Sequence, residues 1–231
     1  MKFKEYALIP ARGGSRGIPR KNLAKVGPIT LLERAILTAI ESNVFHRIVL
    51  SSDDDEILNV AKKYPIDLHR RNSWASTDLS TASDVICDLI PFFEELELES
   101  IRITYLQPTS PFRTSENIVE AMTCADMHSS RSCVSVTKVK NSPYKMVTLT
   151  TDTVNLFFPE KPELLTANRQ QLPDVYLPNG AIYIFPFSSF LRYNQIPIQG
   201  ATYLEMSERE SVDVDSALDL EIARVLDTSI G

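Results

Sequence analysis

Residues 6–22 read YALIPARGGSRGIPRKN, a short apolar run followed at once by a glycine-rich, basic loop. The run 6–9 predicts a buried strand, which Pro10 ends. Ligand loops of open parallel sheets follow the carboxyl ends of strands in the same way. Three of the chain's seven glycines lie in this loop, and glycine lets backbone amides approach an anion closely. We therefore expect an α/β sheet whose first loop binds an anionic ligand.

The loop is positively charged, whereas the whole chain is negatively charged. Five basic residues and no acidic one lie between Arg12 and Lys25, although the whole chain has a net charge of −6. Such a local reversal of sign suits a polyphosphate. The loop lacks both the Gly-Lys-[Ser/Thr] ending of a Walker loop and the Gly-x-Gly-x-x-Gly pattern. A glycine turn with solvated basic side chains is the alternative, and the density of the motif favours an anion site.

Strand-like and helix-like patterns alternate up to about residue 140. We expect strands at 6–9, 47–51, 66–69, 101–106 and 133–139, and helices at 31–42, 54–64 and 115–127, with a further helix near 85–93 that Pro91 should kink. This alternation indicates βαβ units and a mostly parallel sheet. Beyond it we expect a hairpin of 146–150 with 154–158, strands at 181–185 and 202–206, and a helix at 217–226. We interpret 1–231 as a single domain in which 141–178 forms an excursion suited to subunit contacts.

Two carboxylates near the end of the chain form a second candidate site. In Ser211-Val212-Asp213-Val214-Asp215, residues two apart face the same side of an extended segment. Asp213 and Asp215 therefore suit a hard cation such as Mg²⁺. The alternative is a surface strand whose Asp215 or Ser216 caps the next helix. A phosphate loop elsewhere favours the metal, because phosphoryl transfer commonly uses both.

Two further polar segments are candidates for substrate recognition. Gln107, in the segment LQPTSPFR at 106–113, carries both a donor and an acceptor, as recognition of a base or of sugar hydroxyls requires. Arg169 has the fork of donors that binds a carboxylate. A structural turn is the alternative reading both for the first segment and for Asn179-Gly180.

Composition excludes several classes of function. The acidic balance argues against a general nucleic-acid binder. No apolar run approaches the roughly 20 residues that a membrane span needs, and the run at 6–10 is too short for a secretory signal. Three widely spaced cysteines do not indicate a disulfide framework, so we expect a cytoplasmic protein. His46, His69 and His128 lack the spacing of zinc ligands.

Taken together, these motifs resemble the acylneuraminate cytidylyltransferases, also called CMP-sialic acid synthetases, from about Ala7 to Leu226. The resemblance rests on five segments in register: ARGGS at 11–15 with Lys21-Asn22, LQPTSP at 106–111 with Arg113, RQQLP at 169–173, NGAIY at 179–183, and DVD at 213–215. It implies a nucleotidyltransferase fold of the glycosyltransferase-A-like, Rossmann-like kind and a homodimer. It also implies that CTP reacts with a nine-carbon 2-keto sugar acid to give the CMP-sugar and pyrophosphate.

The resemblance also implies roles for individual residues. The nucleotide would be bound by Arg12, Gly13, Gly14, Ser15, Lys21, Asn22 and Arg71. The sugar acid would be bound by Gln107, Asn179 and Tyr183 and, across the dimer interface, by Lys145 and Arg169. Mg²⁺ would be held by Asp213 and Asp215. The residues expected to carry catalysis are Arg12, Lys21 and Asp213.

Several alternatives stay open at this point. N-acetylneuraminate is the first candidate for the sugar acid, and legionaminate and pseudaminate are alternatives. Activation of the eight-carbon acid Kdo with CTP is a further alternative, which the first loop and the RQQLP segment at 169–173 disfavour. Another is a GTP- or UTP-dependent transfer to a phosphorylated sugar. A catalytically inactive sugar-nucleotide sensor is disfavoured, because Lys21, Asp213 and Asp215 are all present.

Overall fold

A seven-stranded sheet forms the centre of the protein. The computed structural model describes residues 3–15, 17–93 and 97–228. The strand order is β11-β7-β10-β6-β1-β4-β5. The strands are β1 (Lys4–Pro10), β4 (Arg47–Ser52), β5 (Asp67–Arg70), β6 (Ile101–Tyr105), β7 (Cys133–Lys138), β10 (Tyr176–Pro186) and β11 (Thr202–Glu205). All neighbours pair in parallel except β10, which runs antiparallel to β6 and β7. The predicted mostly parallel α/β fold is confirmed.

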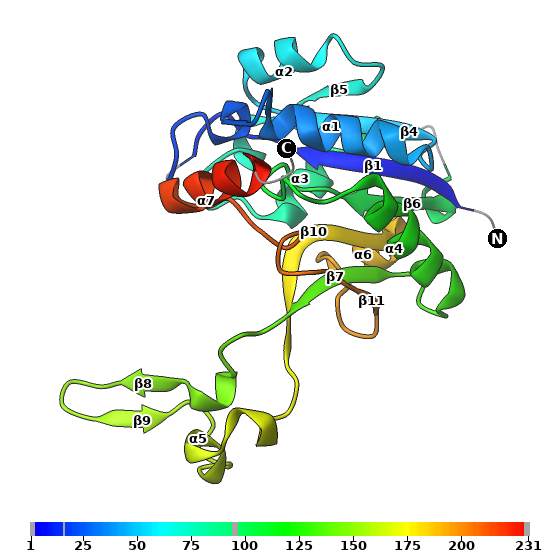
Figure 1. Ribbon diagram of the computed structural model, residues 1–231. Helices are drawn as coiled ribbons and strands as arrows, with labels where there is room; N and C mark the ends of the chain where they lie inside the picture. The colour runs from blue at the N-terminus through cyan, green and yellow to red at the C-terminus, as the bar shows by residue number, and fades with distance from the viewer. Residues whose placement is uncertain (1–2, 16, 94–96, 229–231) are drawn as a thin grey trace.

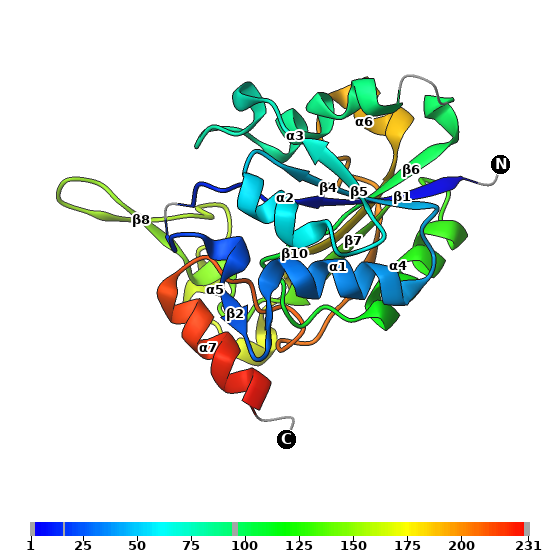
Figure 2. The same ribbon diagram turned by 90° about the horizontal axis from the view of Figure 1, so that it is seen from above.

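Helices cover both faces of this sheet (Figures 1 and 2). The first core joins the sheet to α1 (Leu31–Ser42), α2 (Asp55–Ala61) and α4 (Ser115–Met127), and the second joins it to α3 (Ala82–Asp88) and α6 (Phe187–Tyr193). Along β1, Ala7 and Ile9 enter the first core, whereas Tyr6 and Leu8 enter the second. A strand that is buried on both faces is apolar at every position, which is why the sequence of 6–9 predicts a buried strand so clearly.

Most helix boundaries agree with the sequence-based expectation. Thr30 and Glu33 form a capping box that starts α1 at the predicted residue. The helix expected near 85–93 is broken rather than kinked, because Pro91 lies in a separate 3₁₀ turn, Ile90–Phe93. α2 ends at Ala61, three residues before the predicted end. No helix of the described residues is both long enough and apolar enough to cross a membrane.

A third, smaller apolar cluster joins the two ends of the chain. Ile18 and Val26 of the first loop region pack with Val214 and with Leu220 and Ala223 of α7 (Ala217–Thr228). β2 (Lys25–Val26) and β3 (Ile29–Thr30) form a short hairpin beside α7. This packing places the basic loop next to the segment that contains both candidate metal ligands.

The excursion projects from the body as an arm, here defined as residues 141–178 (Figure 1). It contains the predicted hairpin, β8 (Val147–Leu149) with β9 (Val154–Leu156), and a short helix, α5 (Glu163–Thr166). No residue of the arm is buried within this chain. Leu149, Val154 and Phe157 are respectively 76%, 64% and 54% exposed. A role of the arm in subunit contact stays a prediction.

Candidate active site

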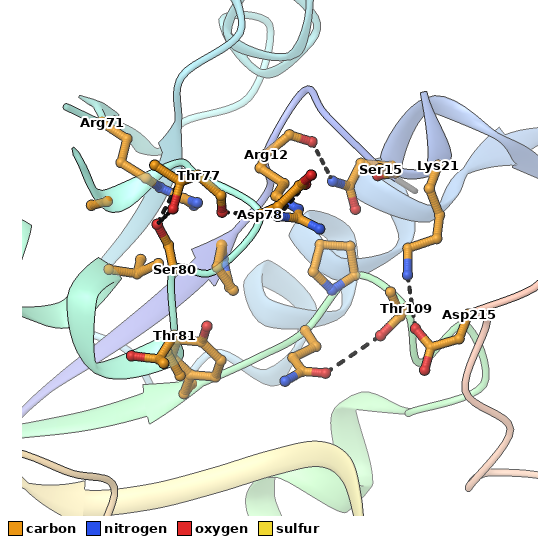
Figure 3. A pocket seen from close by; sticks show the side chains of 18 of the residues that line it. Arg12, Ser15, Lys21, Arg71, Thr77, Asp78, Ser80, Thr81, Thr109 and Asp215 are labelled. Carbon is orange, nitrogen blue, oxygen red and sulfur yellow. Dashed lines mark hydrogen bonds and ion pairs between the residues drawn. The ribbon is translucent and has the colours of Figure 1, made fainter. Parts of the chain in front are cut away.

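A pocket of about 360 Å³ opens where β1 and β6 end and α3 begins. Its walls come from three parts of the sequence and from Asp215 (Figure 3). The loop after β1 contributes Pro10, Arg12, Ser15, Gly17, Lys21 and Asn22; the segment from β5 to α3 contributes Arg71, Ala75, Thr77, Asp78, Ser80, Thr81, Ala82 and Val85; β6 and its loop contribute Tyr105, Gln107, Pro108 and Thr109. The position matches the ligand site of open α/β sheets, at the carboxyl ends of the strands.

The basic loop and the acidic segment meet in this pocket. The Nζ atom of Lys21 lies 2.9 Å from Oδ1 of Asp215, although the two residues are 194 positions apart (Figure 3). Their backbones are also close, because a Cβ atom added to Gly17 would lie 2.3 Å from the carbonyl oxygen of Asp215. The glycine at this position therefore permits the close approach of the two loops.

Arg12 spans the pocket from the loop to the segment before α3. Its Nη1 atom donates to the carbonyl oxygen of Thr77 at 3.0 Å and lies 3.4 Å from the carboxylate of Asp78. Asn22 is buried, and its Nδ2 atom donates to the carbonyl oxygen of Arg12 at 2.9 Å. Asn22 therefore holds the backbone of Arg12 in place in addition to lining the pocket.

The first two glycines of the loop differ from expectation. The Gly13 amide donates to Oδ1 of Asp53 at 3.0 Å, and a Cβ atom at Gly13 would lie 2.5 Å from the carboxylate of Asp54. Gly13 is therefore required for packing against the turn before α2. Gly14 has open space around it, and neither glycine lines the pocket. Contact of these two glycines with the nucleotide stays a prediction.

The carboxylates of the acidic segment differ in environment. Asp215 is exposed, whereas Asp213 is partly buried and its Oδ1 atom has no hydrogen-bond partner among the described residues. Burial raises the pKa of Asp213, the hydroxyl of Thr109 opposes that rise, and the negative charge of Asp215 adds to it. A buried carboxylate oxygen without a donor fits a cation. No group of three or more His, Cys, Asp or Glu side chains suitable for a metal occurs in the described part of the chain. A cation here would therefore have only Asp213 and Asp215 as protein carboxylate ligands.

Gln107 and Gly180 bring the sheet edge close to Asp213. Gly180 has a φ of +79°, and a Cβ atom there would lie 3.2 Å from Oε1 of Gln107 and 4.0 Å from Oδ2 of Asp213. Tyr183, on the same strand, packs edge-on against Tyr105 with ring centroids 6.5 Å apart. Two of the expected sugar-binding segments, 106–111 and 179–183, therefore converge beside Asp213.

Asn179 has a different place from the one expected. Its side chain is buried, and Oδ1 accepts hydrogen bonds from the Ser135 hydroxyl at 2.5 Å and from the Ala181 amide at 3.2 Å. Its Nδ2 atom donates to the Ser211 hydroxyl at 2.8 Å. These bonds hold the irregularity of β10 between Pro178 and Tyr183. The structure gives Asn179 a structural role, because both of its polar atoms are engaged.

Lys145 and Arg169 do not reach the pocket of their own chain. Both lie on the arm, in the short 3₁₀ turns Pro143–Lys145 and Arg169–Gln171. Arg169 instead lines a separate hollow at the base of the arm with Lys138, Lys140 and Asp174. Their expected action across a dimer interface stays a prediction.

Several lining residues had no assigned role in the sequence reading. Thr77, Ser80 and Thr81 face the pocket opposite Arg12 (Figure 3). Tyr105 also lines the pocket. The hydroxyl-rich composition of 76–81 was the available signal for the first three. Tyr105 has no such signal, because within 101–106 it reads only as a core residue of a strand.

Residues 6–217 match the family described as Cytidylyltransferase. An N-acylneuraminate cytidylyltransferase of Escherichia coli O18:K1:H7 is 28% identical over 223 residues, which are 96% of this chain and 52% of the relative. A protein of the same name from Streptococcus agalactiae serotype V is 30% identical over 93% of this chain and 51% of its own length. The chain thus spans about half the length of these two relatives.

A third relative has nearly the same length as this chain. The post-translational flagellin modification protein B of Campylobacter coli is 27% identical over 94% of this chain and 92% of its own length. Among solved structures, a CMP:2-keto-3-deoxy-manno-octonic acid synthetase complexed with CTP aligns with a TM-score of 0.65 at 14% identity, covering 99% of this chain and 100% of that one. A 4-diphosphocytidyl-2C-methyl-D-erythritol synthase gives 0.70 at 15% identity, covering 98% and 99%. At these identities the structures show a shared fold.

Proposed function

The chain belongs to the cytidylyltransferase family, and from this premise we propose that it transfers CMP from CTP to a nine-carbon 2-keto sugar acid and releases pyrophosphate. The resemblance inferred from the motifs is confirmed by the relatives named N-acylneuraminate cytidylyltransferase. N-acetylneuraminate is the first candidate acid. Legionaminate and pseudaminate stay as alternatives, since the relative of nearly equal length is named for flagellin modification rather than for an acid.

The observation that carries the proposal is the meeting of opposite charges in the pocket. Lys21 and Arg12 enter it from the first loop, and Asp215 enters it from the segment before α7 (Figure 3). A nucleoside triphosphate needs cationic side chains along its phosphates, and a metal that bridges those phosphates needs carboxylates. The proposal is supported by the cationic side chains and the Asp215 carboxylate that line one pocket at the carboxyl ends of the strands, with Asp213 two residues before Asp215.

We assign the nucleotide to the side chains that surround the pocket. Arg12, Ser15 and Lys21 would contact the triphosphate, with Asn22 holding the backbone of Arg12. Arg71 would contact the nucleoside from the opposite wall. On the sugar side we assign Gln107 and Tyr183, whose segments converge beside Asp213.

In the proposed reaction the anomeric hydroxyl of the sugar acid attacks the α-phosphorus of CTP, and pyrophosphate leaves. Lys21 and Arg12 offset the negative charge that accumulates on phosphate oxygens in the transition state. Asp213 and Asp215 would hold Mg²⁺, which when bound supplies further neutralisation of that charge. Asp213 and Asp215 are also our candidates to accept the proton of the attacking hydroxyl, directly or through a water molecule.

We further propose that the protein works as a homodimer. No residue of the arm is buried in the single chain, and its hairpin exposes Leu149 and Val154. A segment of this length with exposed apolar side chains gains stability by packing against a second surface. The basic residues Lys145 and Arg169 lie on the same arm, so dimerisation would bring them to the partner's pocket for contact with the sugar carboxylate.

The test is CTP-dependent release of pyrophosphate, measured with and without Mg²⁺. The acids are N-acetylneuraminate, legionaminate, pseudaminate and Kdo, and GTP and UTP replace CTP in parallel reactions. We expect release only with CTP and a nine-carbon acid, and only with the divalent cation. Release with Kdo alone, or with GTP or UTP in place of CTP, would assign a different substrate. CTP binding without release for any acid would favour a non-catalytic sugar-nucleotide-binding protein.

A further inference from the structure

A chain of four polar side chains lies behind the wall of the pocket. Arg71 donates from Nε to the Ser51 hydroxyl at 3.1 Å and from Nη2 to the Ser51 carbonyl oxygen at 2.6 Å. The Ser51 Oγ atom lies 3.1 Å from Nδ1 of His69, and Nε2 of His69 lies 3.7 Å from Oδ2 of Asp88. Ser51, Arg71 and Asp88 are respectively 0%, 5% and 5% exposed. Ser51 of β4 therefore connects Arg71 with the half-buried His69 of β5, and Asp88 of α3 lies beside them.

The direction of the protons in this network follows from Arg71. A guanidinium only donates, so the Ser51 oxygen accepts from Nε and its own hydrogen is left to donate. Nδ1 of His69 lies at hydrogen-bond distance from that oxygen, and it accepts the Ser51 proton in the tautomer that carries its own proton on Nε2. In that tautomer the Nε2 proton lies on the side of Asp88, whose Oδ2 atom is 3.7 Å from Nε2, beyond hydrogen-bond distance. This tautomer of His69 gives the Ser51 hydroxyl both a donor, Arg71, and an acceptor, His69.

The surroundings of His69 keep it in this neutral form. Burial lowers its pKa, and the nearby charge of Arg71 lowers it further, while Asp88 opposes both. The ring also packs edge-on against Phe92, with centroids 6.3 Å apart. Around Arg71 itself, the charged or titratable groups are Asp53, Asp88, Arg12 and Tyr105.

Asp88 also fixes the backbone on the far side of Arg71. Its Oδ2 atom accepts from the Asn72 amide at 2.9 Å, and its Oδ1 atom accepts from Nδ2 of Asn72 at 2.7 Å. The Arg71 amide donates to the carbonyl oxygen of Ser52 at 2.8 Å. The guanidinium and the backbone on both sides of Arg71 are thus held by the same small set of groups.

We propose that Ser51, His69 and Asp88 are positioning residues that fix the Arg71 guanidinium in the orientation that contacts the nucleotide. This inference rests on the proposed function, in which Arg71 contacts CTP. Ser51 holds the plane of the guanidinium, His69 holds the Ser51 hydroxyl, and Asp88 holds the backbone that follows Arg71 through its two hydrogen bonds to Asn72. None of the three lines the pocket.

The first test is a double-mutant cycle on CTP affinity, measured by titration calorimetry of the full chain. Ser51→Ala should weaken CTP binding about tenfold or more, as expected when a hydrogen bond to a charged group is lost. Ser42→Ala is the matched control, since it removes a buried hydroxyl that donates to the Ala39 carbonyl oxygen at the end of α1, and it should change affinity less than about twofold. In an Arg71→Ala background, Ser51→Ala should have no further effect on CTP affinity.

The second test distinguishes positioning from simple loss of packing at His69. In His69→Asn the side-chain amide places a polar atom near the position of Nδ1, so CTP affinity should stay within about threefold of wild type. His69→Leu fills the site with an apolar side chain and removes the hydrogen-bond acceptor of Ser51, so it should weaken CTP binding about fivefold or more. Thermal unfolding of each variant verifies that it is folded.

Three outcomes decide the matter. Equal losses from Ser51→Ala with and without Arg71 would overturn the inference, because a positioning residue acts only through the residue that it positions. Equal effects of His69→Asn and His69→Leu would also overturn it. A wild-type protein that fails to bind CTP would instead refute the proposed function, so the two failures are distinguishable.

Discussion

Replacing Gly17 with alanine tests whether the basic loop and the acidic segment must touch. The added Cβ atom would lie 2.3 Å from the carbonyl oxygen of Asp215, whereas ordinary van der Waals contact begins near 3.4 Å. The obstacle is a backbone atom, so no change of rotamer relieves the clash. One of the two loops must therefore move by about 1 Å, which would also lengthen the 2.9 Å contact between Lys21 and Asp215.

The expected loss follows from that displacement. A misplacement of about 1 Å in a catalytic arrangement typically costs about a hundredfold in rate, or about 2.7 kcal/mol of transition-state stabilisation. We therefore expect kcat/KM of Gly17→Ala for CTP to fall about a hundredfold. The global fold should persist, because Gly17 is exposed and its backbone φ is not positive.

The assay is pyrophosphate release at saturating sugar acid, with thermal unfolding measured for each variant. Gly14→Ala is the matched control, because it adds the same methyl group to the same loop and meets no atom within 4 Å. We expect this control to retain activity within about threefold of wild type. If Gly17→Ala were as active as Gly14→Ala, close contact between the two loops would not be needed for the reaction.

Three further predictions concern charge, pH and assembly. Lys21→Ala should lower kcat by about a hundredfold or more, as loss of one preorganised donor costs roughly 2.7–4 kcal/mol, and near-normal turnover in the CTP assay would refute its role. Although burial opposes the shift, Lys63 and Thr30 lower the pKa of Glu33 from 4.5 to about 2. The charge of Glu33 therefore stabilises the fold above pH 4.5, and this stabilisation is lost as the pH falls toward 2. Glu33→Gln should lower the free energy of unfolding, measured with denaturant, by about 1–2 kcal/mol at pH 7 and by little at pH 2. An equal loss at both pH values would contradict this prediction. Leu149→Glu places a charge on the exposed hairpin of the arm and should shift the protein from dimer to monomer in sedimentation equilibrium, whereas a monomeric wild type would refute the dimer.

The fold was predictable because its strands carry strong local signals. The run 6–9 is apolar on both faces and α1 begins at a capping box, so periodicity and caps located both elements. β10 was predicted to start at 181 but starts at Tyr176. Pro178 and the pair Asn179-Gly180 look like a turn, yet pairing with β7 continues across them through a local irregularity. Tertiary pairing here overrides the local turn signal.

The site was predictable where its residues carry charge in an unusual local context. Arg12, Lys21 and Asp215 come together as the motifs suggested. The role of Gly17 was not visible, because its partner lies almost two hundred positions away and a glycine reveals nothing about what it approaches. His69 reads as an isolated histidine in the sequence, and its link to Ser51 arises only when β4 and β5 pair in register.

The most direct test of the central claim is to follow the α-phosphorus of CTP. CTP labelled at that atom is incubated with the protein, Mg²⁺ and N-acetylneuraminate, legionaminate or pseudaminate, and the products are separated by chromatography. We predict that the label appears in a CMP-sugar in the same amount as the pyrophosphate released. Label that stays in CTP with each of these acids, or that appears only as free CMP, would contradict the account.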